Sequence, residues 1–115
     1  MIAAMEIVRW TDICAVEEIP LRGARRVTVG YEPIAIFRTG DDQLFALVDR
    51  CPHKGGPLSM GIVHGHSVTC PLHAMVIDLA SGEPTGADAG KFCATHVAVR
   101  VEKGRVLLDA NLIAA

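Results

Sequence analysis

The sequence predicts an all-β protein, built as an antiparallel sandwich or barrel. Turn signals rich in glycine, proline and aspartate recur every eight to twelve residues along the chain. Between them lie short runs rich in valine, isoleucine and leucine, at 26–29, 34–37, 44–48, 67–70, 75–78, 97–101 and 105–108. Short strands at this regular spacing are typical of antiparallel sandwiches and barrels. No segment is long and periodic enough to predict a dominant helix.

Two local signals refine this prediction at the ends of the chain. Near the start, Thr11 and Asp12 are good N-cap residues, so a short helical turn is expected over 11–18. Near the end, Lys103 and Gly104 separate two apolar runs, which predicts a tight hairpin because glycine readily adopts positive φ.

The composition indicates a single domain spanning residues 1–115. Half of the residues are hydrophobic and 21% are charged, which excludes extensive disorder. A net charge of −2 and only 4% aromatic residues argue against a nucleic-acid partner. No apolar run reaches the roughly 18 residues of a spanning helix, and no secretory signal is evident at the start. We therefore expect a soluble cytoplasmic protein with no membrane partner.

Two near-duplicate phrases, CPH at 51–53 and CPLH at 70–73, concentrate the metal-binding chemistry of the chain. Each phrase offers one thiolate and one imidazole, and sixteen residues separate them. Two metal centres fit such a set. A single zinc ion takes two cysteines and two histidines in a tetrahedron, whereas a [2Fe–2S] cluster of the Rieske type takes two cysteines on one iron and two histidines on the other. The candidate ligands are Cys51, His53, Cys70 and His73.

The order of the ligands favours the cluster over zinc. Zinc fingers usually pair cysteine with cysteine and histidine with histidine, whereas each phrase here is mixed. Pro52 and Pro71 stiffen the chain after each cysteine, and Gly55 and Gly56 let the backbone close over a bulky buried group. A chance scatter of buried thiols and surface imidazoles is the remaining, less specific, interpretation.

The motif CPHKGGPL with CPLH resembles the signature of the Rieske family. The longer phrases DRCPHKGGPLSMGIVHG, VTCPLH, VIDLASGE and VAVRVEKGRVLL are similar to small subunits of assimilatory NAD(P)H-dependent nitrite reductases, over residues 6–109. The resemblance implies a Rieske-type fold with a base sandwich and a cluster-binding subdomain at about 49–79. It also implies that Cys51 and Cys70 hold the inner iron, and His53 and His73 the outer iron, of a [2Fe–2S] cluster.

The same resemblance implies an electron-transfer subunit that is not catalytic on its own. Its partner would be a large nitrite reductase subunit carrying FAD, an iron–sulfur cluster and sirohaem, which reduces nitrite to ammonia with NAD(P)H. One departure from these relatives is Ala74-Met75, where asparagine or glycine followed by tryptophan is common. The alternatives are a free Rieske ferredoxin serving an aromatic-ring dioxygenase, and a zinc-stabilised interaction module without redox chemistry.

Four positions around the motif predict a low reduction potential. Respiratory members of the family carry two cysteines that form a disulfide between the cluster loops, where this chain has Gly56 and Leu72. They also carry a serine and a tyrosine that donate hydrogen bonds to cluster sulfur, where this chain has Met75 and Ile77. Such hydrogen bonds stabilise the reduced cluster, so their absence predicts a potential roughly near −150 mV rather than +300 mV.

The remaining cysteines and histidines are expected to be structural. Cys14 and Cys93 have no histidine at ligand spacing, so both are predicted to be small buried apolar residues. His64 and His66 flank Gly65 and are predicted to be exposed turn residues, and His96 to be a structural or surface residue.

Overall fold

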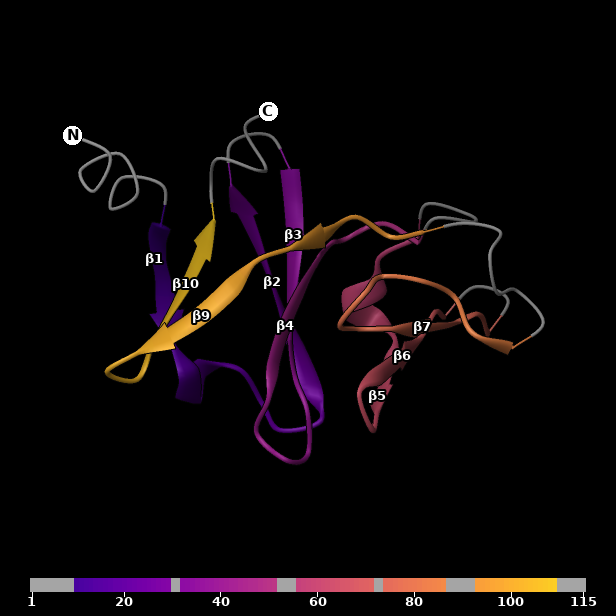
Figure 1. The fold of residues 1–115 in the computed structure, drawn as a ribbon, viewed down its shortest axis with the longest axis horizontal. Helices are drawn as coiled ribbons and strands as arrows, with labels where there is room; N and C mark the ends of the chain where they lie inside the picture. Colours follow the sequence, from indigo (N-terminus) through magenta and orange to yellow (C-terminus); the bar gives the residue numbers. More distant parts are fainter. Residues whose placement is uncertain (1–9, 30–31, 52–55, 72–73, 87–92, 110–115) are drawn as a thin grey trace.

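The computed structural model describes residues 10–29, 32–51, 56–71, 74–86 and 93–109. This part of the chain is all-β and its strands pair antiparallel, which confirms the predicted fold class. The strands form three sheets that lie next to one another along the long axis of the molecule (Figure 1).

Two of the sheets form the larger part of the fold. The first has the order β1-β10-β9 and contains β1 (Trp10–Ala15), β10 (Arg105–Asp109) and β9 (Val99–Glu102). The second has the order β2-β3-β4-β8 and contains β2 (Gly23–Val29), β3 (Glu32–Arg38), β4 (Leu44–Val48) and β8 (His96–Val97).

The third sheet lies beyond the second one (Figure 1). It has the order β5-β6-β7 and contains β5 (Ile62–His64), β6 (Ser67–Thr69) and β7 (Val76–Asp78). Two short 3₁₀ helices complete the described elements, η1 (Val16–Glu18) and η2 (Leu58–Met60). Among these segments there is no helix with the length and apolar character needed to cross a membrane.

Strand β3 is buried on both of its faces and so separates two hydrophobic cores. Ile34 and Ile36 pack into a core with Val106 of the first sheet. Ala35 and Phe37, which alternate with them, pack into the core that contains the motif cysteines. Successive side chains of a strand point to opposite faces, so one apolar run supplies both cores. The second sheet is therefore the middle layer of the molecule.

The hairpin prediction at the C-terminal end is confirmed, and the helical prediction at the N-terminal end is correct only for its last three residues. Lys103 and Gly104 turn between β9 and β10 with φ of 52° and 76°, the positive values that a tight two-residue turn requires. Thr11 and Asp12 lie in β1, paired with Leu108 and Leu107, because the edge of β10 offers backbone hydrogen bonds to this segment. Within 11–18, helical structure is confined to the 3₁₀ turn of η1.

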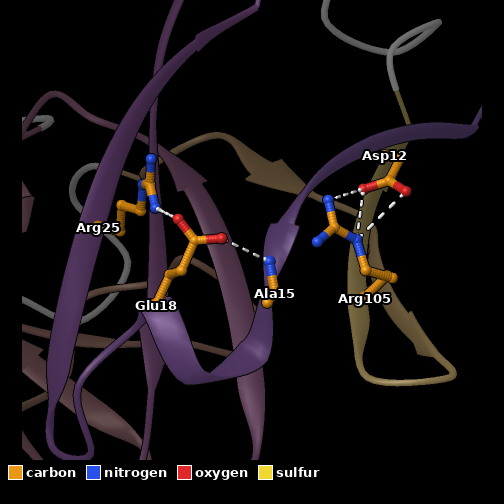
Figure 2. A network of polar contacts seen from close by, with 5 residues as sticks. All are labelled: Asp12, Ala15, Glu18, Arg25 and Arg105. Carbon is orange, nitrogen blue, oxygen red and sulfur yellow. Dashed lines mark hydrogen bonds and ion pairs between the residues drawn. The ribbon is translucent and has the colours of Figure 1, made fainter.

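A group of exposed charges ties η1 and β1 to their neighbours (Figure 2). The Glu18 carboxylate accepts a hydrogen bond from the Ala15 N–H at 2.9 Å and pairs with Arg25 of β2. On β1, Asp12 pairs with Arg105 of β10 at 2.9 Å. The hydrogen bond from Ala15, and then Arg25, hold the pKa of Glu18 below its ordinary value of 4.5.

This lowered pKa predicts an acid-sensitive contribution from Glu18. A carboxyl group whose pKa falls on folding stabilises the folded state above its ordinary pKa, and the contribution is lost as the pH falls through the folded value. We expect Glu18→Gln to lower stability at neutral pH and to lose less stability than the wild type below pH 4.5. Urea unfolding across this range measures both effects. Glu17→Gln is the matched control, and an equal acid response in the two variants would contradict the prediction.

Candidate metal centre

The first motif cysteine lies just beyond the end of β4. Its N–H donates to the Gly56 carbonyl oxygen at 2.6 Å, which closes the intervening loop at its base. Two residues before Cys51, the Asp49 N–H donates to the Pro33 carbonyl oxygen at 2.8 Å. This hydrogen bond attaches the start of the loop to β3. Cys51 itself is 2% exposed.

The second motif cysteine is held in the same way. Cys70 follows β6 directly, and its N–H donates to the Met75 carbonyl oxygen at 2.8 Å. Ala74 has a φ of 54°, in the left-handed region, where the chain turns back toward β7. In both loops the cysteine N–H bonds the carbonyl five residues further on, so the doubled phrase corresponds to a doubled backbone closure.

The fold brings the two cysteine loops to one place. Cys51 and Cys70 belong to the same hydrophobic core, with Leu58, Met75 and Ile77 among its members. Gly61 allows the backbone after η2 to lie close to the end of β6. A Cβ at this position would lie 2.3 Å from the carbonyl oxygen of Thr69, the residue before Cys70. Any side chain here would push the end of η2 away from β6. Gly61 was not predicted as a site residue, since a close backbone approach leaves no motif in the sequence.

The two predicted histidine ligands, His53 and His73, lie outside the described residues. Within the described ranges, no group of three histidine, cysteine or acidic side chains forms a metal site. The two cysteines alone already restrict the chemistry. Their side chains are buried in apolar surroundings at matching positions of two loops, as a cluster with buried bridging sulfides requires. The donors that the structure describes therefore fit a [2Fe–2S] cluster.

The other cysteines behave differently from each other. Cys14 is 2% exposed in the core between the first two sheets, as predicted, and burial raises the pKa of its thiol above 9.0. The prediction that Cys93 is buried is wrong, because its side chain is exposed. The chain turns inward one residue later, where Ala94 is buried and donates its N–H to the Gly82 carbonyl.

The conspicuous histidines of the β5–β6 hairpin are exposed, as predicted, but they also have partners. His64 Nε2 lies 2.7 Å from the Thr69 hydroxyl. His66 Nε2 lies 2.9 Å from an Asp41 carboxylate oxygen, and its ring packs against Phe45 at 5.3 Å between centroids. His66 thus connects the hairpin of the third sheet to the β3–β4 turn. His96 is exposed in β8, in agreement with its predicted surface position.

A buried carboxylate beside the first cysteine loop was missed by the sequence analysis. The Asp49 side chain is 0% exposed. Its two oxygens accept hydrogen bonds from the Ser59 N–H and the Ser59 hydroxyl, both at 2.7 Å. The Arg26 Nε lies 3.5 Å from one of these oxygens. An aspartate next to a turn ordinarily indicates a solvated residue, so neither its burial nor its partner ten residues away could be read from the sequence.

Comparison with known proteins identifies this arrangement. The family model of the Rieske [2Fe-2S] domain matches residues 9–97. The chain belongs to the Rieske [2Fe–2S] family. This match supports the cluster rather than the alternative zinc site, and it makes the protein an electron-transfer component of an oxidoreductase system.

Individual Rieske proteins are similar over most of the chain. The anthranilate 1,2-dioxygenase ferredoxin subunit of Burkholderia cepacia is 38% identical over 78 residues, which cover 68% of this chain and 71% of that protein. A chain in the complex of reduced oxygenase and oxidized ferredoxin of carbazole 1,9a-dioxygenase superposes with a TM-score of 0.78 and 30% identity, covering 89% of this chain and 94% of that one.

A protein of another kind has the same fold. A chain assigned as an NADH-dependent nitrite reductase small subunit from Mycobacterium tuberculosis superposes with a TM-score of 0.77 and 24% identity. The alignment covers 86% of this chain and 92% of that one. At this identity the likeness is one of fold.

The cysteine assignments can be tested by removing each thiol. We expect Cys51→Ser and Cys70→Ser to lose the iron and the visible absorption of the purified protein, because a hydroxyl is a poor ligand for a cluster that is held by thiolates. Iron analysis and absorption spectra measure the loss. Cys93→Ser is the matched control, since this thiol is exposed and is not a member of the motif core. Full iron content in either motif variant would refute the assignment.

The apolar surroundings of the motif cysteines predict a low reduction potential for the cluster. Met75 and Ile77 are 3% and 0% exposed and belong to the core of the two cysteines, and neither side chain can donate a hydrogen bond to sulfur. We expect a midpoint potential roughly near −150 mV. A redox titration followed by electron paramagnetic resonance measures it, and a strongly positive midpoint would show that other donors reach the cluster.

Proposed function

We propose that this protein is a Rieske ferredoxin that delivers single electrons to the oxygenase of an aromatic-ring dioxygenase system. In this role it would accept an electron from a reductase and pass it on without bond chemistry of its own. The observation that carries the proposal is the 38% identity to a dioxygenase ferredoxin subunit across two thirds of the chain. The nitrite reductase type of protein is matched by fold, at 24% identity in the superposition.

We further propose that Cys51, His53, Cys70 and His73 are the four ligands, within a cluster-binding subdomain at about 49–79. The closure of both loops by matching hydrogen bonds supports the equivalent roles of the two cysteines. When bound, the [2Fe–2S] cluster supplies a centre that is reversibly reduced by one electron.

The described residues keep water away from the cysteine side of this centre. Leu58, Met75 and Ile77 are buried around the two thiols, so this side faces the protein core. Histidine ligands, by contrast, keep a second ring nitrogen that can reach solvent or a partner. We therefore expect electrons to enter and leave near His53 and His73.

The second candidate is the small subunit of an assimilatory NAD(P)H-dependent nitrite reductase. The sequence phrases around the motif favour it, and a chain assigned to this class has the same fold over 92% of its length. Its partner would be the large subunit with FAD, an iron–sulfur cluster and sirohaem. A cytoplasmic location is expected for either function.

Direct electron transfer distinguishes the two candidates. The protein is reduced with dithionite, freed of the excess reductant, and mixed in a stopped-flow instrument with the oxidised oxygenase component of anthranilate 1,2-dioxygenase. A parallel mixture contains a sirohaem-bearing nitrite reductase large subunit with nitrite. We expect rapid reoxidation with the oxygenase and slow reoxidation with the nitrite reductase subunit. The absorption of the cluster reports both rates.

Two controls make the result specific. Cys51→Ser, which should lack the cluster, must give no transfer in either mixture. Cys93→Ser must behave as the wild type. Rapid nitrite-dependent reoxidation, together with a stable complex with the sirohaem subunit, would replace the first candidate with the second.

A further inference from the structure

The buried carboxylate of Asp49 lies at the base of the first cysteine loop and joins its two ends. On one side, the Asp49 N–H bonds the Pro33 carbonyl at 2.8 Å. On the other, the two carboxylate oxygens bond the N–H and hydroxyl of Ser59 at 2.7 Å each. We call this pair of hydrogen bonds the Asp49–Ser59 bridge. It encloses the shorter closure between Cys51 and Gly56, so the loop is tied twice.

The bridge also attaches the loop to the middle sheet. Arg26 of β2 places its Nε 3.5 Å from the Asp49 carboxylate, and Ser59 belongs to η2, whose residue Leu58 is fully buried in the motif core. Charged hydrogen bonds of this kind are among the stronger ones in proteins, and a buried carboxylate that loses them is costly. The bridge is therefore a stiff connection between the first cysteine loop and the sheet below it.

Asp49 is close along the chain to Cys51, the first proposed ligand. Two residues span at most about 7 Å, so the Cα atoms of Asp49 and Cys51 lie within this distance. A buried charge this near a ligand interacts with the cluster through a poorly screening environment. The Arg26 charge offsets part of that effect, but its side chain is 52% exposed and thus better screened by water.

We infer that Asp49 is a positioning residue for the iron–sulfur site, which fixes the Cys51 loop through the Asp49–Ser59 bridge and lowers the reduction potential through its negative charge. Outer partners of metal ligands commonly act in both ways. The inference rests on the proposed ligand role of Cys51, but it is independent of whether the partner is an oxygenase or a nitrite reductase.

Substitutions can separate the geometric effect from the electrostatic one. Asp49→Asn removes the charge but keeps the bridge, because the amide oxygen accepts from the Ser59 N–H and the hydroxyl can turn to accept from the amide. Asp49→Ala removes the charge and the bridge together. Arg26→Gln removes the opposite charge and leaves the bridge intact.

Two measurements on the iron-loaded protein test the inference. The first is the midpoint potential, which we expect to rise in Asp49→Asn and to fall by a smaller amount in Arg26→Gln. The second is the rate of loss of the visible absorption in excess chelator, which we expect to be roughly tenfold or more faster in Asp49→Ala and close to wild type in Asp49→Asn. If Asp49→Ala does not load, Ser59→Ala weakens the same bridge more mildly and takes its place.

Two control variants show whether the changes in potential and iron loss are specific to Asp49 or follow from any loss of stability. Asp78 accepts hydrogen bonds from the N–H and hydroxyl of Ser81, the same pairing at a more exposed site, so Asp78→Asn should leave the potential close to wild type. Val106→Ala destabilises the other core, and at equal loss of overall stability it should release iron more slowly than Asp49→Ala.

Three outcomes would count against the inference in different ways. Unchanged potentials in both Asp49→Asn and Arg26→Gln would overturn the electrostatic role. Equal iron loss in Asp49→Ala and Val106→Ala would overturn the positioning role. Retention of the cluster in Cys51→Ser would instead remove the ligand assignment on which the inference rests.

Discussion

The burial of strand β3 on both faces is the constraint on which the rest of the structure depends. Its alternate residues enter two separate cores, one shared with the first sheet and one shared with the motif cysteines. Because β3 lies between β2 and β4 and its residues 34–37 are buried, it cannot shift register by one residue without exchanging the two sets of side chains. The position of the cysteine loops is thereby fixed by the same strand that holds the larger part of the fold together.

Next to this strand, the surroundings of Cys51 and Cys70 are organised mainly by backbone contacts. Both cysteine loops are closed by an N–H that donates to the carbonyl five residues on, and the absence of a side chain at Gly61 lets the loops approach. Side chains contribute at the edges of the site, where Asp49 joins the ends of one loop and His66 ties the neighbouring hairpin to the β3–β4 turn. The backbone next to each cysteine is thus fixed by several contacts at once.

The sequence was informative where function requires particular residue types at particular spacing. The all-β class followed from short apolar runs between turns, and the family followed from the paired cysteine–histidine phrases. Prediction failed where a residue's environment depends on distant partners. Cys93 is exposed, although a cysteine without a histidine at ligand spacing was expected to be buried. Thr11 and Asp12 join a strand because they pair with β10. The burial of Asp49 depends on a serine ten residues away.

The side chains of β3 point alternately into two cores, so substitutions at neighbouring positions of this strand affect different parts of the molecule. Changes at Ile34 or Ile36 act first on the core that stabilises the base, whereas changes at Ala35 or Phe37 act on the core around the cysteines. Neighbouring positions can therefore evolve for different properties. Members of such a family can diversify the surroundings of the redox centre while the scaffold beneath it stays constant, which helps one small fold serve electron acceptors of unlike chemistry.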